Sequence, residues 1–183
     1  MSLPNLPYNI PDTVTQKAQN IKLALFDVDG VLTDGSLRYG PKGEEIKVFN
    51  ALDGHGLKML QQAKIDVGVI SARNSAALKT RLSDLGIKHC HLGVNDKLSV
   101  FEELVAKLNV SPQECSFAGD DVIDLPVMNQ CGLKFSVENG HFIVKHLADW
   151  VTPIPGGSGA VRAICDVLLY SQDSYPLNFS STQ

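Results

Sequence analysis

The chain has 183 residues, of which 44% are apolar, and its 16 Lys and Arg against 20 Asp and Glu leave a formal net charge of −4. A chain of this length can bury a full hydrophobic core, so a single domain over residues 1–183 is expected. No run of basic residues marks a nucleic-acid surface, and no apolar stretch approaches the roughly 20 residues of a membrane span. The polar, Pro-rich start differs from a secretory signal, which predicts a cytoplasmic protein without nucleic-acid or membrane partners.

Short apolar runs alternate with segments of helical periodicity along the chain. This alternation predicts an α/β fold, a Rossmann-like parallel sheet with flanking helices. The two clearest helices are expected over 97–108, with Asp96 as the N-cap, and over about 160–170. The predicted strands are 21–26, 66–71, 89–93, 115–119, 133–137 and 149–152.

Residues 36–50 read differently, because SLRY and EEIKVF are strand-like and PKG between them has turn chemistry. We expect a small β-hairpin that projects from the sheet. An isolated hairpin is marginal in water, so it is predicted to pack on another subunit. About the first 15 residues, and a flexible tail over about 171–183, are expected to order only on another surface.

The cysteines and histidines offer little functional signal. Asp53-Gly54-His55-Gly56 predicts a turn before a helix, in which His55 is as much a structural as a substrate-binding candidate. No C-x-x-C pair and no zinc-like arrangement with histidine is present, so the cysteines are predicted to be reduced core residues. The cysteines are Cys90, Cys115, Cys131 and Cys165, and the histidines assigned no role are His89, His91, His141 and His146.

Three predicted strands end in side chains that can carry chemistry. The first strand runs into Asp27-Val28-Asp29-Gly30, the second ends at Ser71-Ala72-Arg73, and the 115–119 strand ends at Gly119-Asp120-Asp121. Ligands of open parallel sheets bind outside the carboxyl ends of the strands. We therefore predict a functional site at this edge of the sheet.

Converging carboxylates repel one another unless a hard divalent cation with oxygen ligands lies between them. Asp27 and Asp120 are the expected ligands, and Asp121 is a further candidate. Mg²⁺ suits such a site because it keeps room for substrate phosphate oxygens, with Ser71 and Lys97 on the opposite side. Residue types alone do not separate Mg²⁺ from Mn²⁺ or Co²⁺.

These motifs resemble the haloacid dehalogenase superfamily over roughly residues 21–165: DVDGVLTDG its first motif, Ser71 its second, Lys97 its third and GDDVIDLP its fourth. A Gly is expected in the second motif where this chain has Ala72. Within the superfamily, the small hairpin in place of a cap domain, Asn95-x-Lys97-Leu98 and GG-x-GAVR at 156–162 resemble phosphatases that act on the 8-phosphate of an eight-carbon 3-deoxy sugar acid. The resemblance implies lipopolysaccharide sugar synthesis and a homotetramer joined through the hairpins.

The resemblance also implies a role for each motif residue. Asp27 would attack phosphorus and form an aspartyl-phosphate, and Asp29 would act as general acid and base while its carbonyl binds the metal. The remaining roles are phosphate or substrate binding by Ser71, Arg73 and Lys97, a direct metal bond from Asp120, and support of Asp120 by Asp121 and Asp124.

Three other readings fit parts of the pattern. A phospho-accepting receiver domain combines an aspartyl-phosphate, Mg²⁺, a hydroxyl residue and a Lys, but its acidic pair precedes the phospho-acceptor, whereas here the pair comes late. A non-catalytic oligomeric relative would not need all these residue types. A phosphatase for another nonulosonate or sugar-acid phosphate fits the motifs equally well. Only an assay can distinguish it from a phosphatase for the eight-carbon 3-deoxy sugar acid.

Overall fold

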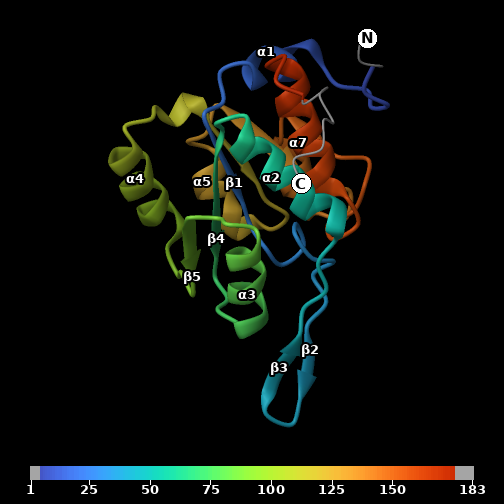
Figure 1. The fold of residues 1–183 in the computed structure, drawn as a ribbon, viewed down its shortest axis with the longest axis vertical. Coiled ribbons are helices and arrows are strands. Elements are labelled where there is room, and N and C mark those ends of the chain that lie inside the picture. The colour runs from blue at the N-terminus through green and yellow to red at the C-terminus, as the bar shows by residue number, and fades with distance from the viewer. Residues whose placement is uncertain (1–4, 176–183) are drawn as a thin grey trace, which may run out of the picture.

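A computed structural model describes residues 5–175 and contains a six-stranded parallel sheet between two layers of helices (Figure 1). Each neighbouring pair of strands is parallel. The strands, in spatial order, are β5 (His89–Leu92), β4 (Asp66–Ser71), β1 (Leu23–Phe26), β6 (Cys115–Ala118), β7 (Leu133–Ser136) and β8 (Trp150–Val151). The predicted fold class is confirmed, with β1 and β6 side by side at the centre.

Side chains of the central strand alternate between the two faces of the sheet, and both faces are buried. Ala24 and Phe26 belong to one apolar cluster, and Leu23 and Leu25 to the other. A strand covered on both sides needs apolar residues at every position, which explains the continuous LALF run. The first cluster is covered by α1 (Asp12–Ala18), α2 (Ala51–Gln62), α3 (Ala76–Asp84) and α7 (Ala160–Ser171), and the second by α4 (Lys97–Leu108), α5 (Leu125–Met128) and α6 (Phe142–Leu147).

Helix α4 has the predicted bounds, and the Asp96 carboxylate caps it by accepting hydrogen bonds from the amides of Leu98 and Ser99, at 3.0 and 3.2 Å. Helix α7 is one residue longer than predicted. The prediction for His55 is wrong, because this residue lies within α2 rather than in a turn before it, and its side chain faces solvent.

The hairpin consists of β2 (Arg38–Gly40) and β3 (Gly43–Ile46), which pair antiparallel and extend away from the sheet (Figure 1). Gly43 takes a φ of +114°, a left-handed conformation that favours Gly at the turn. Tyr39, Ile46 and Val48 are 62, 53 and 56% exposed. The hairpin, and Val48 shortly after it, therefore expose apolar side chains to solvent in the monomer.

The N-terminal segment packs on the core of its own domain. Val14 and Ala18 of α1 are fully buried, and the Trp150 indole N–H donates to the Asn9 carbonyl at 3.1 Å. The start of the predicted tail is also docked, since Gln172 Nε2 donates to the carbonyls of Ala18 and Ile21, at 2.9 and 2.8 Å. Both expectations are wrong for the described residues, and residues 1–4 and 176–183 lie outside them.

The cysteine prediction holds except for one residue. All four cysteines are free thiols, and Cys115, Cys131 and Cys165 are buried. Cys90 is exposed because β5 is the edge strand of the sheet, with no further strand beyond it. Among residues 5–175, no helix combines the length and apolar character needed to cross a bilayer.

Candidate active site

The central strands bring the first and fourth motifs together at the carboxyl edge of the sheet. Asp27 directly follows β1, and its amide donates to the carbonyl of Ala118 at the end of β6, at 2.9 Å. Asp120 lies two residues after Ala118, the last residue of β6. These carboxylates line a cleft of about 390 Å³, within the usual range for small-ligand sites. The cleft is lined by Asp27, Asp29, Gly35, Leu37, Ser71, Ala72, Arg73, Lys97, Asp120, Asp121 and Ile123.

Lys97, the first residue of α4, supplies a buried positive charge. Its ammonium lies 2.8 Å from Asp27 Oδ1 and 2.7 Å from Asp124 Oδ1, and its side chain is only 4% exposed. Burial alone would lower the pKa of Lys97, but the two carboxylates outweigh it and raise that pKa. The lysine is therefore charged, and it fixes the nucleophile candidate against the fourth motif.

Asp124 organises the loop that carries Asp120. It is fully buried, and its Oδ2 accepts hydrogen bonds from the amides of Asp120 and Asp121, at 3.1 and 3.3 Å. The Asp121 carboxylate instead turns back to its own loop and accepts from the Val122 amide at 2.7 Å. The supporting position expected of Asp124 is thus present, whereas Asp121 is exposed.

The carboxylates fit a divalent cation. Asp27, Asp120 and Asp124 each offer one oxygen, and these oxygens lie within 4.8 Å of one another. Asp120 Oδ1 is buried without a hydrogen-bond partner, which is costly unless a cation or another donor reaches it. Hard oxygen donors of this kind suit Mg²⁺. Asp121 is not part of this cluster. Asp124 is, but its Oδ1 already pairs with Lys97 and its Oδ2 accepts from two amides, which leaves Asp27 and Asp120 as the carboxylates available to a cation.

Glycine at position 30 lets the two loops meet. Gly30 has a φ of +101°, and a Cβ added there would lie 2.1 Å from Asp120 Oδ2. On its other side, a Cβ on Gly156 would lie 1.7 Å from the Gly30 carbonyl oxygen. The GG-x-GAVR segment therefore packs directly against the first motif, which accounts for Gly156 and Gly157, whereas Gly159 has a φ of +113° that favours Gly.

Burial and mutual repulsion both raise the pKa values of carboxyl groups in the cluster. Burial, followed by the charge of Asp124, raises the pKa of Asp27 to about 6 although Lys97 opposes the shift. Burial, followed by the charges of Asp27, Asp124 and Asp121, raises the pKa of Asp120 to about 8. A bound cation would relieve both effects.

These shifts predict a pH-dependent response to Mg²⁺. A carboxyl whose pKa is raised on folding contributes stability below its unfolded pKa and loses it as pH rises through its folded pKa. The metal-free protein should therefore lose stability between about pH 4 and pH 8 through Asp27 and Asp120. Thermal denaturation should show a larger Mg²⁺-induced rise in Tm at pH 8 than at pH 5.5. An Mg²⁺ effect that is larger at pH 5.5 would contradict this linkage.

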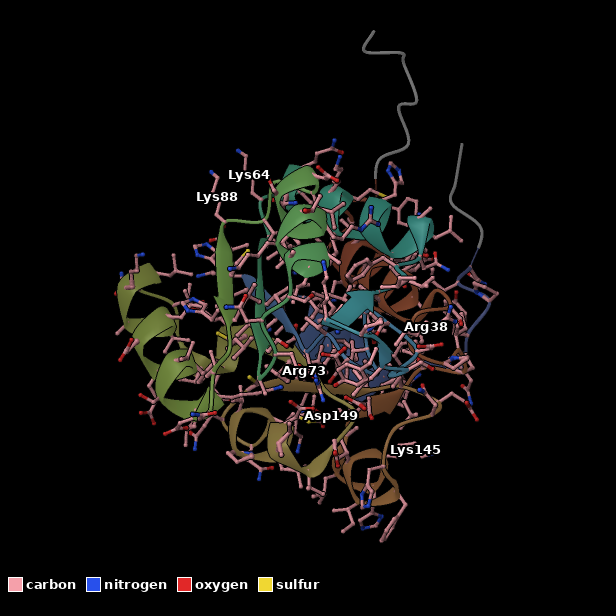
Figure 2. All side chains as sticks on the ribbon, turned by 90° about the horizontal axis from the view of Figure 1, so that it is seen from below. Arg38, Lys64, Arg73, Lys88, Lys145 and Asp149 are labelled. Atoms are coloured by element: carbon pink, nitrogen blue, oxygen red, sulfur yellow. The ribbon has the colours of Figure 1, made fainter. Side chains whose placement is uncertain are left out.

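The second motif lines the same cleft as the metal-ligand candidates. Ser71 is buried at the end of β4, and its hydroxyl accepts from the Arg73 amide at 3.2 Å. The Arg73 guanidinium donates to the Tyr39 hydroxyl on the hairpin at 3.0 Å. Figure 2, seen from the hairpin side, shows Arg73 near the middle of this face. The hairpin thus holds a cationic side chain over the cleft, while Ala72 adds a methyl group to its lining.

Sequence reasoning missed Lys47, which enters the site from the residues after β3. Its ammonium forms an ion pair with Asp29 Oδ1, and its side chain is 2% exposed. A lone Lys in a strand-like segment is ordinarily solvated, so its residue type carried no signal. The alternation of EEIKVF could have placed Lys47 opposite Ile46 and Val48.

Comparison with known proteins agrees with the site. A family profile described as haloacid dehalogenase-like hydrolase matches residues 90–164. The 3-deoxy-D-manno-octulosonate 8-phosphate phosphatase of Yersinia pestis is 44% identical over 164 residues, which cover 90% of this chain and 88% of that protein. Its crystal structure superposes with a TM-score of 0.87 at 45% identity, over 89% of this chain and 88% of that one.

A phosphatase of the same name from Moraxella catarrhalis, solved with a magnesium ion, a phosphate ion and a KDO molecule, has a TM-score of 0.86 at 39% identity, covering 88% of this chain and 93% of that one. Fold, motifs and relatives together define a phosphatase of the haloacid dehalogenase-like hydrolases. Within them, the chain belongs to the family of 3-deoxy-D-manno-octulosonate 8-phosphate phosphatases. The resemblance drawn from the motifs is confirmed.

Proposed function

We propose that this chain is a Mg²⁺-dependent phosphatase that hydrolyses 3-deoxy-D-manno-octulosonate 8-phosphate to the free sugar acid and phosphate. The observation that carries the proposal is the convergence of Asp27, Lys97 and Asp120 in one cleft at the carboxyl edge of the sheet. The relative that binds magnesium, phosphate and KDO supports the choice of ligands. We further propose that residues 1–183 act as a single domain.

The proposed reaction takes place in two displacements at phosphorus. In the first, an Asp27 oxygen attacks phosphorus, the bond to the sugar oxygen breaks, and Asp29, protonated on the Oδ2 that does not face Lys47, gives its proton to the departing oxygen. An aspartyl-phosphate on Asp27 results. In the second, Asp29 takes a proton from a water molecule whose oxygen attacks phosphorus, which releases phosphate and restores Asp27.

Phosphoryl transfer depends mainly on positioning and on charge stabilisation. Lys97 would hold Asp27 in line and offset phosphate charge, and the Ser71 hydroxyl would donate to a phosphate oxygen. Arg73 would bind phosphate or the sugar carboxylate. A Mg²⁺ ion held by Asp27, Asp120 and the Asp29 carbonyl would neutralise further phosphate charge, while Asp124 and Asp121 shape the loop behind it.

The direct test is phosphate release from 3-deoxy-D-manno-octulosonate 8-phosphate, beside other nonulosonate and sugar-acid phosphates, with Mg²⁺ and with chelator. We expect turnover only with Mg²⁺ and the highest kcat/KM for the octulosonate. A different preferred sugar acid would keep the mechanism and reassign the substrate. No release from any phosphate ester would overturn the proposal and favour a non-catalytic oligomeric relative.

Replacing Asp29 with Asn should separate the two displacements. An amide cannot deliver or accept the proton, so kcat is expected to fall by roughly 10²–10⁴-fold. With p-nitrophenyl phosphate, whose leaving group needs no proton, the first displacement should persist and leave phosphate on Asp27. Intact-protein mass spectrometry after a rapid acid quench would detect the added phosphate. Wild-type turnover in this variant would contradict the assignment.

We also propose a homotetramer assembled through the hairpins, in which neighbouring subunits cover the cleft. The support is the exposed apolar arm, where Leu37 at 37%, Tyr39, Ile46 and Val48 are open to solvent in the monomer. Sedimentation velocity would test the assembly. A cytoplasmic location and a place in lipopolysaccharide sugar synthesis are proposed from family resemblance.

A further inference from the structure

We infer that Lys47 is a positioning residue for Asp29, and that the hairpin takes part in catalysis within its own subunit by delivering it. The inference rests on the proposed role of Asp29 as general acid and base. It gives the hairpin a function beyond covering a cleft or joining subunits, because an intact hairpin would be needed to hold the acid–base carboxyl of the same chain.

At the base of the hairpin, the side chain of the lysine is buried and the apolar residues beside it are exposed. The neighbouring apolar side chains of Ile46 and Val48 are 53 and 56% exposed, whereas the Lys47 side chain is 2% exposed. This is the reverse of the usual distribution, in which the apolar side chains are buried and the lysine is solvated. Burying an ammonium group is unfavourable unless a charge partner compensates it, and the Asp29 carboxylate is such a partner.

The two carboxylate oxygens of Asp29 have different surroundings. Oδ1 pairs with the Lys47 ammonium, while Oδ2 is buried and has no hydrogen-bond partner among the described residues. Asp29 also lines the cleft beside Asp27. One oxygen is therefore anchored and the other remains available to exchange a proton with the sugar oxygen or with water.

Orientation of this kind affects rate more than binding. A carboxylate joined to a loop by rotatable bonds samples several orientations, and displacement of a reacting group by about 1 Å can cost on the order of 10²-fold in rate. Lys47 holds the carboxylate from a segment 18 residues further along the chain. Its loss should therefore lower kcat for the proton-dependent steps with little change in KM or in Mg²⁺ binding.

The experiment compares Lys47→Met and Lys47→Gln with Lys88→Met, a matched control at an exposed position before the edge strand β5, outside the hairpin and the cleft. With the octulosonate phosphate, both Lys47 variants should lose about 10- to 100-fold in kcat, with KM and the Mg²⁺-induced rise in Tm close to those of wild type. Lys47→Arg should recover part of the loss. The control should keep wild-type kcat.

Single-turnover kinetics with p-nitrophenyl phosphate separate positioning from general damage. Release of p-nitrophenolate needs no proton from Asp29, so its first-turnover rate should be near wild type in Lys47→Met while steady-state turnover falls. In an Asp29→Asn background, Lys47→Met should cause little further loss, since residues that act as a unit are not additive.

Three results would overturn the inference: wild-type kcat in both Lys47 variants, an equal slowing of both p-nitrophenyl phosphate rates, or a multiplicative loss in the double variant. The outcome is independent of the sugar. If wild-type protein cleaves p-nitrophenyl phosphate but not the octulosonate ester, the proposed substrate fails while the Lys47 measurements stand. A variant that does not fold is identified by circular dichroism, and the other Lys47 variants then decide.

Discussion

Asp27→Asn should abolish phosphatase turnover while leaving the fold intact. The amide oxygen is a poor nucleophile, so kcat is expected to fall by at least roughly 10⁴-fold. The fold should be retained although the variant loses the ion pair with Lys97, because Lys97 keeps Asp124 as a partner at 2.7 Å, and because burial and the charge of Asp124 raise the pKa of Asp27 to about 6 and disfavour its ionised form. A neutral isostere removes one of the repelling charges from the cluster.

Phosphate release and thermal denaturation without metal are the two measurements for this variant. The Tm should be equal to or above that of wild type, and Mg²⁺ should raise it less because one ligand is weakened. Asp84→Asn, which changes an exposed carboxylate at the end of α3, is the matched control. Substantial turnover by the Asp27 variant would rule out Asp27 as the nucleophile.

Lys97→Met should have the largest effect on stability. The substitution removes the cation 2.8 Å from Asp27 and 2.7 Å from Asp124, and leaves two carboxylates buried without it. Breaking a buried ion pair on one side typically costs about 3–5 kcal/mol. Activity should also be lost, because Lys97 joins the Asp27 carboxylate to Asp124 of the fourth motif.

Urea unfolding without metal, at pH 8 and pH 5.5, measures this loss. The deficit relative to wild type should be smaller at pH 5.5, because protonation of the cluster reduces the repulsion that Lys97 normally offsets. Lys107→Met on the exposed side of α4 provides the same chemical change without a buried partner. A deficit below about 1 kcal/mol at both pH values would show that the ion pairs do not stabilise the fold.

The sequence predicted those parts of the architecture that depend on patterns within short segments. The 3.6-residue spacing of apolar positions defined α4 with its Asp96 cap, and β-like runs located the parallel strands to within two residues at their ends. The convergence of Asp27 and Asp120 also followed from sequence, since residues just beyond neighbouring parallel strands must meet at one edge. Lys97 reaches the same place from 70 residues away because α4 begins at that edge.

Within the fourth motif, residue type alone did not show which aspartate points into the site. Asp121 and Asp124 are both carboxylates near Asp120, yet Asp124 is fully buried against Lys97 while Asp121 is exposed and caps its own loop. A short 3₁₀ turn over Val122–Asp124 decides which of the two points inward. The direction of a side chain in such a turn depends on what packs against it, and spacing does not encode that packing.

By itself, the sequence determined the sheet, the order of its motifs and the class of chemistry, because periodicity and strand-end residues are properties of short segments. Only the tertiary structure decided that the N-terminal segment docks on the core, that Cys90 lies on an edge strand, and that Lys47 reaches Asp29. Each of these depends on burial between segments distant in the chain. Burial reverses the usual preference of a side chain for water whenever a partner compensates it, and the identity of that partner is fixed only by the fold.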